Sequence, residues 1–150
     1  MGFIRAIGLG LVLLVLTLNL AACATMGDQP PSLYKRLGGR DGIAIVVDDF
    51  VANMVADARV NARFQGMQPP AVFKLKSNLS DQICDATGGP CSYLGRDMKT
   101  THTGMNISDA EWTATVENLV KALDKYKVGA KEKSELLGAL GPMKGDIVGR

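Results

Sequence analysis

The segment GGPCSYLGRDMKTTHTGM, residues 88–105, carries the only histidine of the chain, His102. Its two glycines and its proline predict a turn, and the run from Asp97 to His102 predicts one short helical turn closed by Gly104. A new helix is expected almost at once, because Ser108 and Glu111 form a capping box, in which each residue satisfies a backbone N–H at the helix start. The histidine is therefore expected on a short element just before a long helix.

Long amphipathic helices are predicted on both sides of this histidine. The helix after Ser108 has an apolar face made of Trp112, Val116, Leu119, Leu123 and Tyr126. The helix before the histidine is expected to begin at residues 69–70, because proline is tolerated only in the first turn of a helix. Its apolar face comprises Val72, Leu75, Leu79 and Ile83, and residues 88–90 end it.

Two further helices complete the predicted domain. Near its start, one helical face is formed by Ile43, Val46, Val47, Phe50 and Met54. Residues 43–47 also favour a strand, but the pattern continues to Ala58, which is too long for one. A turn is expected at residues 60–64, and the last helix spans about 131–148 with a kink at Pro142. The fold class is therefore all-α.

The N-terminal residues are typical of a targeting segment rather than of the folded domain. Residues 7–18 form an apolar run that suits a signal-peptide core. The tetrad at 20–23 resembles the lipobox of bacterial lipoproteins, which implies cleavage after residue 22 and acylation of Cys23. An ordinary secretory leader cleaved near Ala22 is the alternative. We therefore expect a signal peptide at 1–22, a tether at 23–32 and one domain at 33–150.

Charge and cysteine content narrow the possible partners. The formal net charge is only +2, and Arg5 leaves with the leader, so there is no electrostatic case for a nucleic-acid partner. Cys84 and Cys91 remain in a compartment expected to be oxidising, where they form either a disulfide or two free thiols. Neither belongs to a C-x-x-C-H motif, which excludes a covalently attached c-type haem.

A single imidazole cannot build a zinc cage or a catalytic triad alone, but it can hold one haem iron. The competing interpretation of His102 is a partly buried, hydrogen-bonded residue near a helix end. Three features favour an iron ligand. The short element lies between two long helices, the face carrying Leu75 and Leu79 is apolar, and Lys99 could pair with a haem propionate.

The whole predicted domain resembles a group I truncated haemoglobin. The opening of that family is matched by LYKRLGGRDGI at 33–43, its first long helix is similar to VVDDF at 46–50, and Phe64 matches the phenylalanine after the next turn. The glycines at 88–89 precede its proximal motif, which YLGRDMKTTHTG at 93–104 resembles closely. These motifs follow in the family's order over residues 32–148.

The resemblance implies a two-over-two helical sandwich around a non-covalent b-type haem, with His102 as the proximal iron ligand. It also implies haem contacts from Phe50, Phe64, Leu75, Leu79, Met98, Lys99, Ile107 and Trp112. Many members place a tyrosine and a glutamine beside the bound gas, whereas the matching residues here are Val51 and Leu79, with Leu75 one turn earlier. An apolar distal pocket is therefore expected, unless Gln82 or Asn78 turns inward, and it predicts fast release of O2 and easy oxidation of the iron.

Three functions follow from these features. The first is a haem protein that binds O2, NO or CO, is held to a bacterial membrane through Cys23 and faces the periplasm. The second is a nitric oxide dioxygenase or other haem redox enzyme, which needs an electron donor that the sequence does not identify. The third is a haem-free helical lipoprotein with a structural or partner-binding role.

Overall fold

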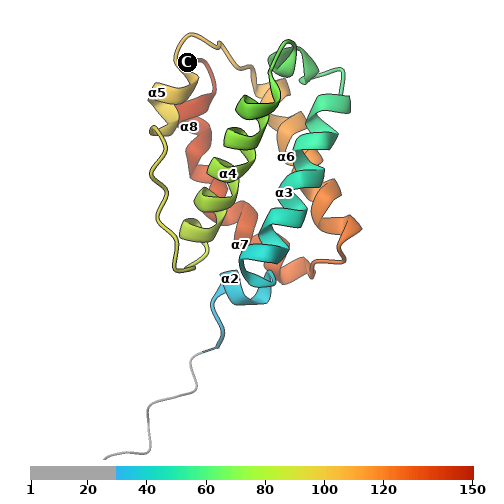
Figure 1. Ribbon diagram of the computed structural model, residues 1–150, viewed down its shortest axis with the longest axis vertical. Coiled ribbons are helices and arrows are strands. Elements are labelled where there is room, and N and C mark those ends of the chain that lie inside the picture. Colours follow the sequence, from blue (N-terminus) through green and yellow to red (C-terminus); the bar gives the residue numbers. More distant parts are fainter. Residues whose placement is uncertain (1–29) are drawn as a thin grey trace, which may run out of the picture. The chain divides into compact units, whose positions relative to one another are not determined.

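The computed structural model describes residues 30–150, and these residues fold into helices joined by short turns (Figure 1). The predicted signal peptide, Cys23 and most of the tether lie outside the described residues. The elements are α2 (Leu33–Arg36), α3 (Gly39–Ala56), the 3-10 turn η2 (Asn61–Phe64), α4 (Pro69–Ala86), α5 (Met98–His102), α6 (Asp109–Lys125), α7 (Ala130–Leu140), the 3-10 turn η3 (Gly141–Met143) and α8 (Lys144–Ile147). The only β pairing within residues 30–150 is one isolated parallel bridge between Ile107 and Val148. The all-α prediction is confirmed.

Two antiparallel helix pairs, α3 with α4 and α6 with α7, form the body of the domain (Figure 1). Helix α3 packs against both α4 and α6, and α7 contributes the remaining wall. The core consists of Ile43, Val46, Val47, Phe50, Val51, Met54, Val60, Ile83, Cys84, Ala114, Leu119, Ala122, Leu123 and Leu136. Burial of this apolar surface is the main favourable contribution to folding.

Local sequence signals set the helix starts. Helix α4 has proline in its first two positions, and α6 begins with the complete capping box of Ser108 and Glu111, as predicted. Helices α2 and α3 meet at a sharp turn in which Gly38 has a φ of 86°. A Cβ at Gly42 would collide with the carbonyl oxygen of Leu37, so the close approach of these helices requires glycine there.

The structure corrects three details of the predicted helices. Helix α2 was not expected, because four residues are too few for a periodic pattern. Pro142 does more than kink the last helix: the chain passes through η3 before α8, since proline lacks the N–H that an α-helix needs. Tyr126 is not a core residue, because it is the C-cap of α6 and 40% of its surface is exposed.

Cys84, in the last turn of α4, forms a disulfide with Cys91 in the following loop. The Cα atoms of the two residues lie 5.8 Å apart. Cys84 is fully buried in the core, whereas Cys91 is half-buried. No helix among the described residues combines the length and the apolar character that crossing a bilayer requires.

Candidate haem-binding site

The short helix α5 determines the orientation of His102. The Asp97 side chain accepts a hydrogen bond from the Thr100 amide, which starts the helix and lowers the pKa of the Asp97 carboxyl. One turn later, Nδ1 of His102 lies 2.8 Å from the carbonyl oxygen of Met98. Because a carbonyl can only accept, Nδ1 must carry the proton, and Nε2 presents a lone pair. This is the tautomer that a metal-ligating imidazole adopts when its other nitrogen donates to a backbone carbonyl.

The side chains predicted to contact haem differ in burial. A half-buried set comprises Phe64, Leu75, Leu79, Met98, Ile107 and Trp112, while Phe50 and Val51 lie in the core and Lys99 is exposed. His102 is itself half-buried. Phe64, Leu75 and Leu79 pack against the hydrophobic core and are only partly buried. Partly exposed apolar side chains and a half-buried imidazole are the residue types that a flat apolar group with an iron at its centre requires.

The donor set fits an iron held by a porphyrin better than a bare metal ion. Residues 30–150 contain no group of three or more His, Cys, Asp or Glu side chains placed to hold a metal. A protein-only site for a transition metal needs three or four such ligands. A porphyrin supplies four nitrogens itself, so one imidazole is sufficient.

Gln82 joins α4 to the histidine-bearing helix. Its amide nitrogen lies 3.3 Å from Sδ of Met98 and 3.4 Å from Sδ of Met143, in α5 and η3 respectively. The sequence raised Gln82 as a substitute donor for bound gas. Its amide is instead engaged with two thioether sulfurs, which are weak acceptors.

An ion pair that the sequence analysis did not predict lies next to Val51, the predicted distal residue. Nζ of Lys76 in α4 is 2.9 Å from Oδ1 of Asp48 in α3, one turn before Val51. From periodicity alone, Lys76 lies off the apolar face of its helix. The ion pair connects α3 to α4 at the level where the sequence places the apolar distal residues.

Arg63 is a second residue that the sequence did not identify. From η2, its Nε donates to Glu111 Oε1 at 2.7 Å and its Nη1 donates to the Met105 carbonyl at 2.7 Å. The bond from Arg63 is the main reason why the pKa of Glu111 falls to about 2. Arg63 therefore holds the turn that follows His102 against the start of α6. The sequence around Arg63 does not predict these contacts, because Glu111 and Met105 are more than 40 residues away in the chain.

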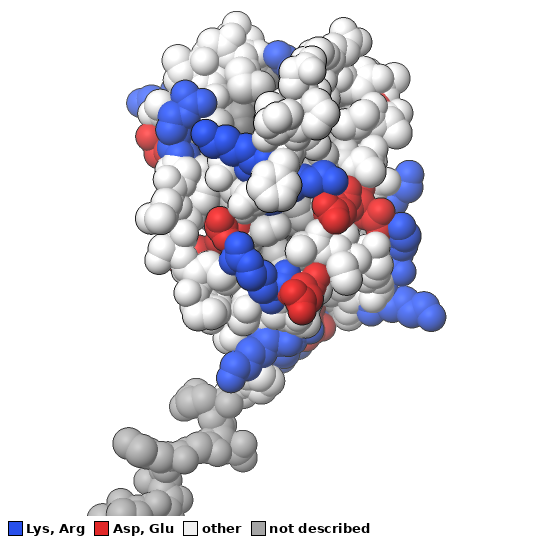
Figure 2. Space-filling model, viewed as in Figure 1, with Lys and Arg blue, Asp and Glu red and all other residues white. Residues whose placement is uncertain are grey.

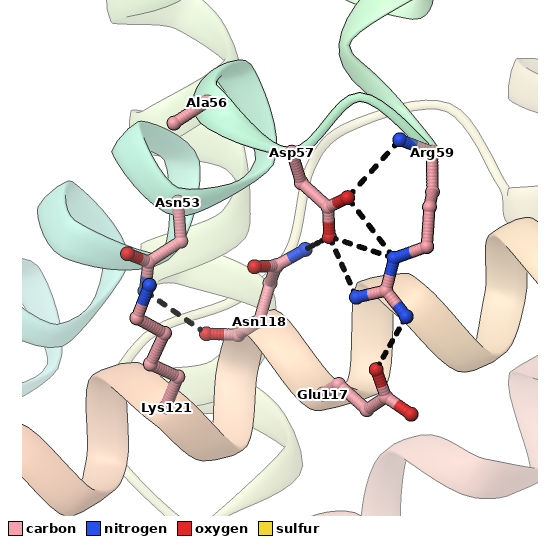
Figure 3. Close-up of a pocket in the computed structure, with 7 residues that line it drawn as sticks. All are labelled: Asn53, Ala56, Asp57, Arg59, Glu117, Asn118 and Lys121. Atoms are coloured by element: carbon pink, nitrogen blue, oxygen red, sulfur yellow. Dashed lines mark hydrogen bonds and ion pairs between the residues drawn. The ribbon is translucent and has the colours of Figure 1, made fainter.

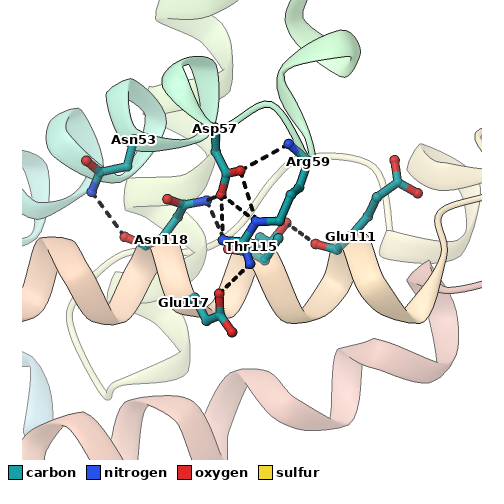
Figure 4. Close-up of polar contacts among 8 residues, drawn as sticks. Asn53, Asp57, Arg59, Glu111, Thr115, Glu117 and Asn118 are labelled. Atoms are coloured by element: carbon teal, nitrogen blue, oxygen red, sulfur yellow. Dashed lines mark hydrogen bonds and ion pairs between the residues drawn. The ribbon is translucent and has the colours of Figure 1, made fainter.

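Two surface hollows of similar volume lie away from His102. One, about 350 Å³, is lined by residues at the α3 end and along α6, including Asn53, Asp57 and Lys121 (Figure 3). Within it, Asp57 accepts hydrogen bonds from Arg59 and from the buried Asn118, and both lower the pKa of Asp57 (Figure 4). The second hollow, about 340 Å³, lies between α3 and the α6–α7 turn. Neither is lined by His102, so shape alone does not locate the candidate site.

Charge on the α4–α5 face is mixed. Figure 2 shows Lys and Arg side chains over α4 and α5, with Asp and Glu side chains between them. Lys99 is exposed on α5, three residues before His102. The balance of the two signs on this face agrees with the small net charge of the chain.

Comparison with known proteins shows to which family the chain belongs. The family model described as bacterial-like globin matches residues 32–148. The group 1 truncated hemoglobin of Mycolicibacterium paratuberculosis is 31% identical over 119 residues, covering 79% of this chain and 85% of the relative. The group 1 truncated hemoglobin of Tetrahymena pyriformis is 26% identical, covering 82% of this chain and 99% of its own.

Solved structures are similar in the same region. The Fe(III) form of the Tetrahymena pyriformis protein superimposes with a TM-score of 0.75 at 26% identity, over 80% of this chain and all of that one. A 2/2 hemoglobin from Synechococcus, solved in the cyanomet state with covalently attached heme, gives a TM-score of 0.73 at 28% identity with the same coverage. The two-over-two arrangement predicted for the helices is thereby confirmed.

Proposed function

Because the chain belongs to the bacterial-like globin family and, within it, to the group 1 truncated haemoglobins, we propose that it is a haem protein that reversibly binds a diatomic gas. The observation that carries this proposal is the His102 imidazole, whose Nδ1 is fixed by the Met98 carbonyl and whose Nε2 is free for iron. Bound haem would supply an iron centre that takes O2, NO or CO.

The residues of the chain would hold the group from several elements. Leu75 and Leu79 present apolar surface from α4, Met98 from α5, and Trp112 from α6. Lys99 would pair with a propionate at the exposed edge. Val51 has no hydrogen-bond donor to offer the gas, so the oxy complex would be stabilised by the bond to iron and by apolar packing.

We propose that the haem is of b type and is held without a covalent link. The two cysteines in residues 30–150 are joined to each other, so neither sulfur is free for a thioether bond to a vinyl group. Neither lies in a C-x-x-C-H motif.

The disulfide also supports our proposal for localisation. Disulfides persist in oxidising compartments such as the bacterial periplasm. Together with the lipobox-like tetrad at 20–23, this favours a globin domain anchored through Cys23 and exposed to the periplasm. Detection of palmitate on Cys23 by mass spectrometry of the membrane fraction would test the anchor, and a mature chain without lipid would reject it.

Gas storage or transport is favoured over nitric oxide dioxygenation. Dioxygenation needs a long-lived oxy complex, and the side chain at Val51 cannot donate a hydrogen bond to stabilise one. It also needs an electron donor. Rapid mixing of the oxy form with NO, followed by measurement of nitrate, separates the two activities.

Optical spectra of the ferric, ferrous and CO-bound forms test the haem proposal. Purified protein offered haemin should give a Soret band in all three states. His102→Ala should weaken haem binding and change the spectrum, and added imidazole should restore the wild-type spectrum by taking the vacated position at the iron. Circular dichroism checks that the variant still folds. Wild-type protein that stays colourless would refute the proposal.

A further inference from the structure

The disulfide ties the loop that carries the histidine-bearing helix to the core. The chain leaves α4 at one end of the domain, runs back beside it as an irregular segment, and reaches α5 at the other end (Figure 1). The bond between Cys84 and Cys91 lies near the start of this segment. Cys84 belongs to the buried core, so the bond links the segment directly to the rigid part of the molecule.

The segment has few other attachments. Among the described residues 91–96, no backbone amide or carbonyl takes part in a backbone–backbone hydrogen bond. The Tyr93 amide donates to Asp85 Oδ2 at 3.0 Å, and the Tyr93 hydroxyl donates to the Arg96 carbonyl at 2.8 Å. Segments held by so few bonds open at low free-energy cost. The disulfide is therefore the strongest restraint on this part of the chain.

A short path connects the segment to His102. The Arg96 carbonyl, which accepts from Tyr93, also accepts from the Thr101 hydroxyl at 3.2 Å. Thr101 is the neighbour of His102 in α5. A change in the position of residues 91–96 would thus be passed to the imidazole through the first turn of a five-residue helix, which is too short to hold its own geometry.

The two sulfurs differ in access and in charge. Cys84 is fully buried, whereas Cys91 is half-buried. Nη1 of Arg40 lies 3.3 Å from Sγ of Cys91, and Arg40 also pairs with Asp81 at 2.8 Å. A guanidinium beside a sulfur favours its thiolate form. Cys91 is therefore the sulfur that an external thiol reaches, and its thiolate is stabilised once released.

We propose that the Cys84–Cys91 disulfide is a redox-sensitive clamp on His102, so that its reduction loosens the haem. This inference rests on the proposed haem-binding function. In the oxidised protein the segment holds α5, and with it Nε2 of His102, in place for the iron. In the reduced protein the segment is held to α4 by the hydrogen bond from the Tyr93 amide to Asp85 and no longer by a covalent bond, so it moves more freely. Formation of the bond from His102 to iron then requires more ordering of the chain.

Reduction by a dithiol proceeds in two balanced steps. A thiolate of the dithiol attacks Sγ of Cys91, which forms a mixed disulfide and releases Cys84 as a thiolate that takes up a proton. The second thiolate of the dithiol then attacks its own bound sulfur, which closes a cyclic disulfide and releases Cys91. The protein disulfide gains two electrons and two protons, and the dithiol loses both.

Haem loss to an excess of apomyoglobin tests the clamp. Four samples are compared: wild type and the double variant Cys84→Ala/Cys91→Ala, each loaded with ferric haem, with and without dithiothreitol. We expect dithiothreitol to speed haem loss from the wild type about tenfold, as expected when a short closed loop is opened. The double variant should lose haem fast in both conditions, which controls for effects of the reductant on the iron.

Equal rates from oxidised and reduced wild type would overturn the clamp while leaving the proposed function intact. Oxidised wild type that takes up no haem would instead refute the proposed function.

Hydrogen exchange on the haem-free protein gives a second readout. Reduction should raise the exchange rates of the amides at residues 101–103 about tenfold, because their acceptors lie in or just before α5. The amides of the central helix α3 should keep their protection. Loss of protection in α3 as well would show general unfolding, and unchanged rates in α5 would show no coupling; either result overturns the clamp.

Discussion

Single side chains decide what the candidate site can bind. The imidazole of His102 is oriented by a bond within its own helix, from Nδ1 to the carbonyl four residues earlier. This arrangement requires that residues 98–102 be helical, and five residues are too few to keep that geometry without support from neighbouring segments.

The residue at position 51 should control the lifetime of bound O2. We expect Val51→Tyr to slow O2 dissociation about ten- to a hundredfold, because a hydrogen bond to a charged partner is worth roughly 1.5–3 kcal/mol. Laser photolysis or stopped-flow mixing of the oxy protein with CO measures the rate. Val51→Phe is the matched control, since it adds the ring without the hydroxyl. Val51 is only 3% exposed, so both variants carry the same overpacking penalty. Equal rates in the two variants would place this residue away from the gas.

The stability of the individual helices depends on the hydrogen bonds at their ends as well as on their apolar faces. Helix α6 starts with Ser108 and Glu111, and Arg63 reaches from η2 to the same carboxylate. Helix α5 starts with Asp97 in a similar way. The capping box of Ser108 and Glu111 was predicted from the sequence because the two residues are three positions apart, whereas Asp97 was expected within the helical turn and not as its cap. The arginine was not predicted, because its position depends on the packing of η2 against α6.

The Glu111 cluster should make the stability of the domain depend on acid pH. The folded-state pKa of Glu111 is lowered from 4.5 to about 2, chiefly by the bond from Arg63. A lowered carboxyl pKa stabilises the fold at pH values above 4.5, and this contribution is lost as the pH falls toward 2. Glu111→Gln should therefore be less stable than wild type at pH 7, and the difference should shrink below pH 4.5.

Urea unfolding at several pH values between 2.5 and 7 measures this difference. Glu117→Gln on the same helix is the control, because the Glu117 side chain is 56% exposed and pairs with one arginine at the surface. A constant gap between Glu111→Gln and wild type across this range would contradict the assignment.

At the scale of the whole molecule, one core joins the helices. Leu136 reaches it from α7 and is 1% exposed, so its packing supports both helix pairs at once. We expect Leu136→Ala to lower the free energy of unfolding by about 2–5 kcal/mol. Leu94→Ala, in the loop before α5 at 92% exposure, should change it by less than about 0.5 kcal/mol. Urea unfolding followed by circular dichroism and by Trp112 fluorescence measures both, and should show one transition. Two separate transitions would mean that the helix pairs unfold independently.

Much of the fold could be read from periodicity. The apolar positions of α3, α4 and α6 recur with the helical repeat, and prolines, glycines and caps mark where these helices begin and end. Helix α2 was not predicted because a single turn is too short to show helical periodicity. Tyr126 was wrongly assigned to the apolar face because the apolar pattern continues one residue beyond the last turn of α6. The candidate site was likewise only partly predictable from the sequence. His102 and its helical turn stand out in the sequence, whereas Arg63, the Lys76–Asp48 pair and the contacts of Gln82 with two methionine sulfurs do not.

The sequence by itself determined the helical class and the position of the single imidazole in a short helical turn before a capped helix, because helical periodicity and caps depend on residues within one or two turns of each other. Only the tertiary structure decided which sulfur is buried, how the 91–96 segment is restrained, and which polar groups face α5. Those properties depend on contacts between residues that are distant in the chain. Their geometry is fixed by how the helices pack, and packing is a property of the whole core.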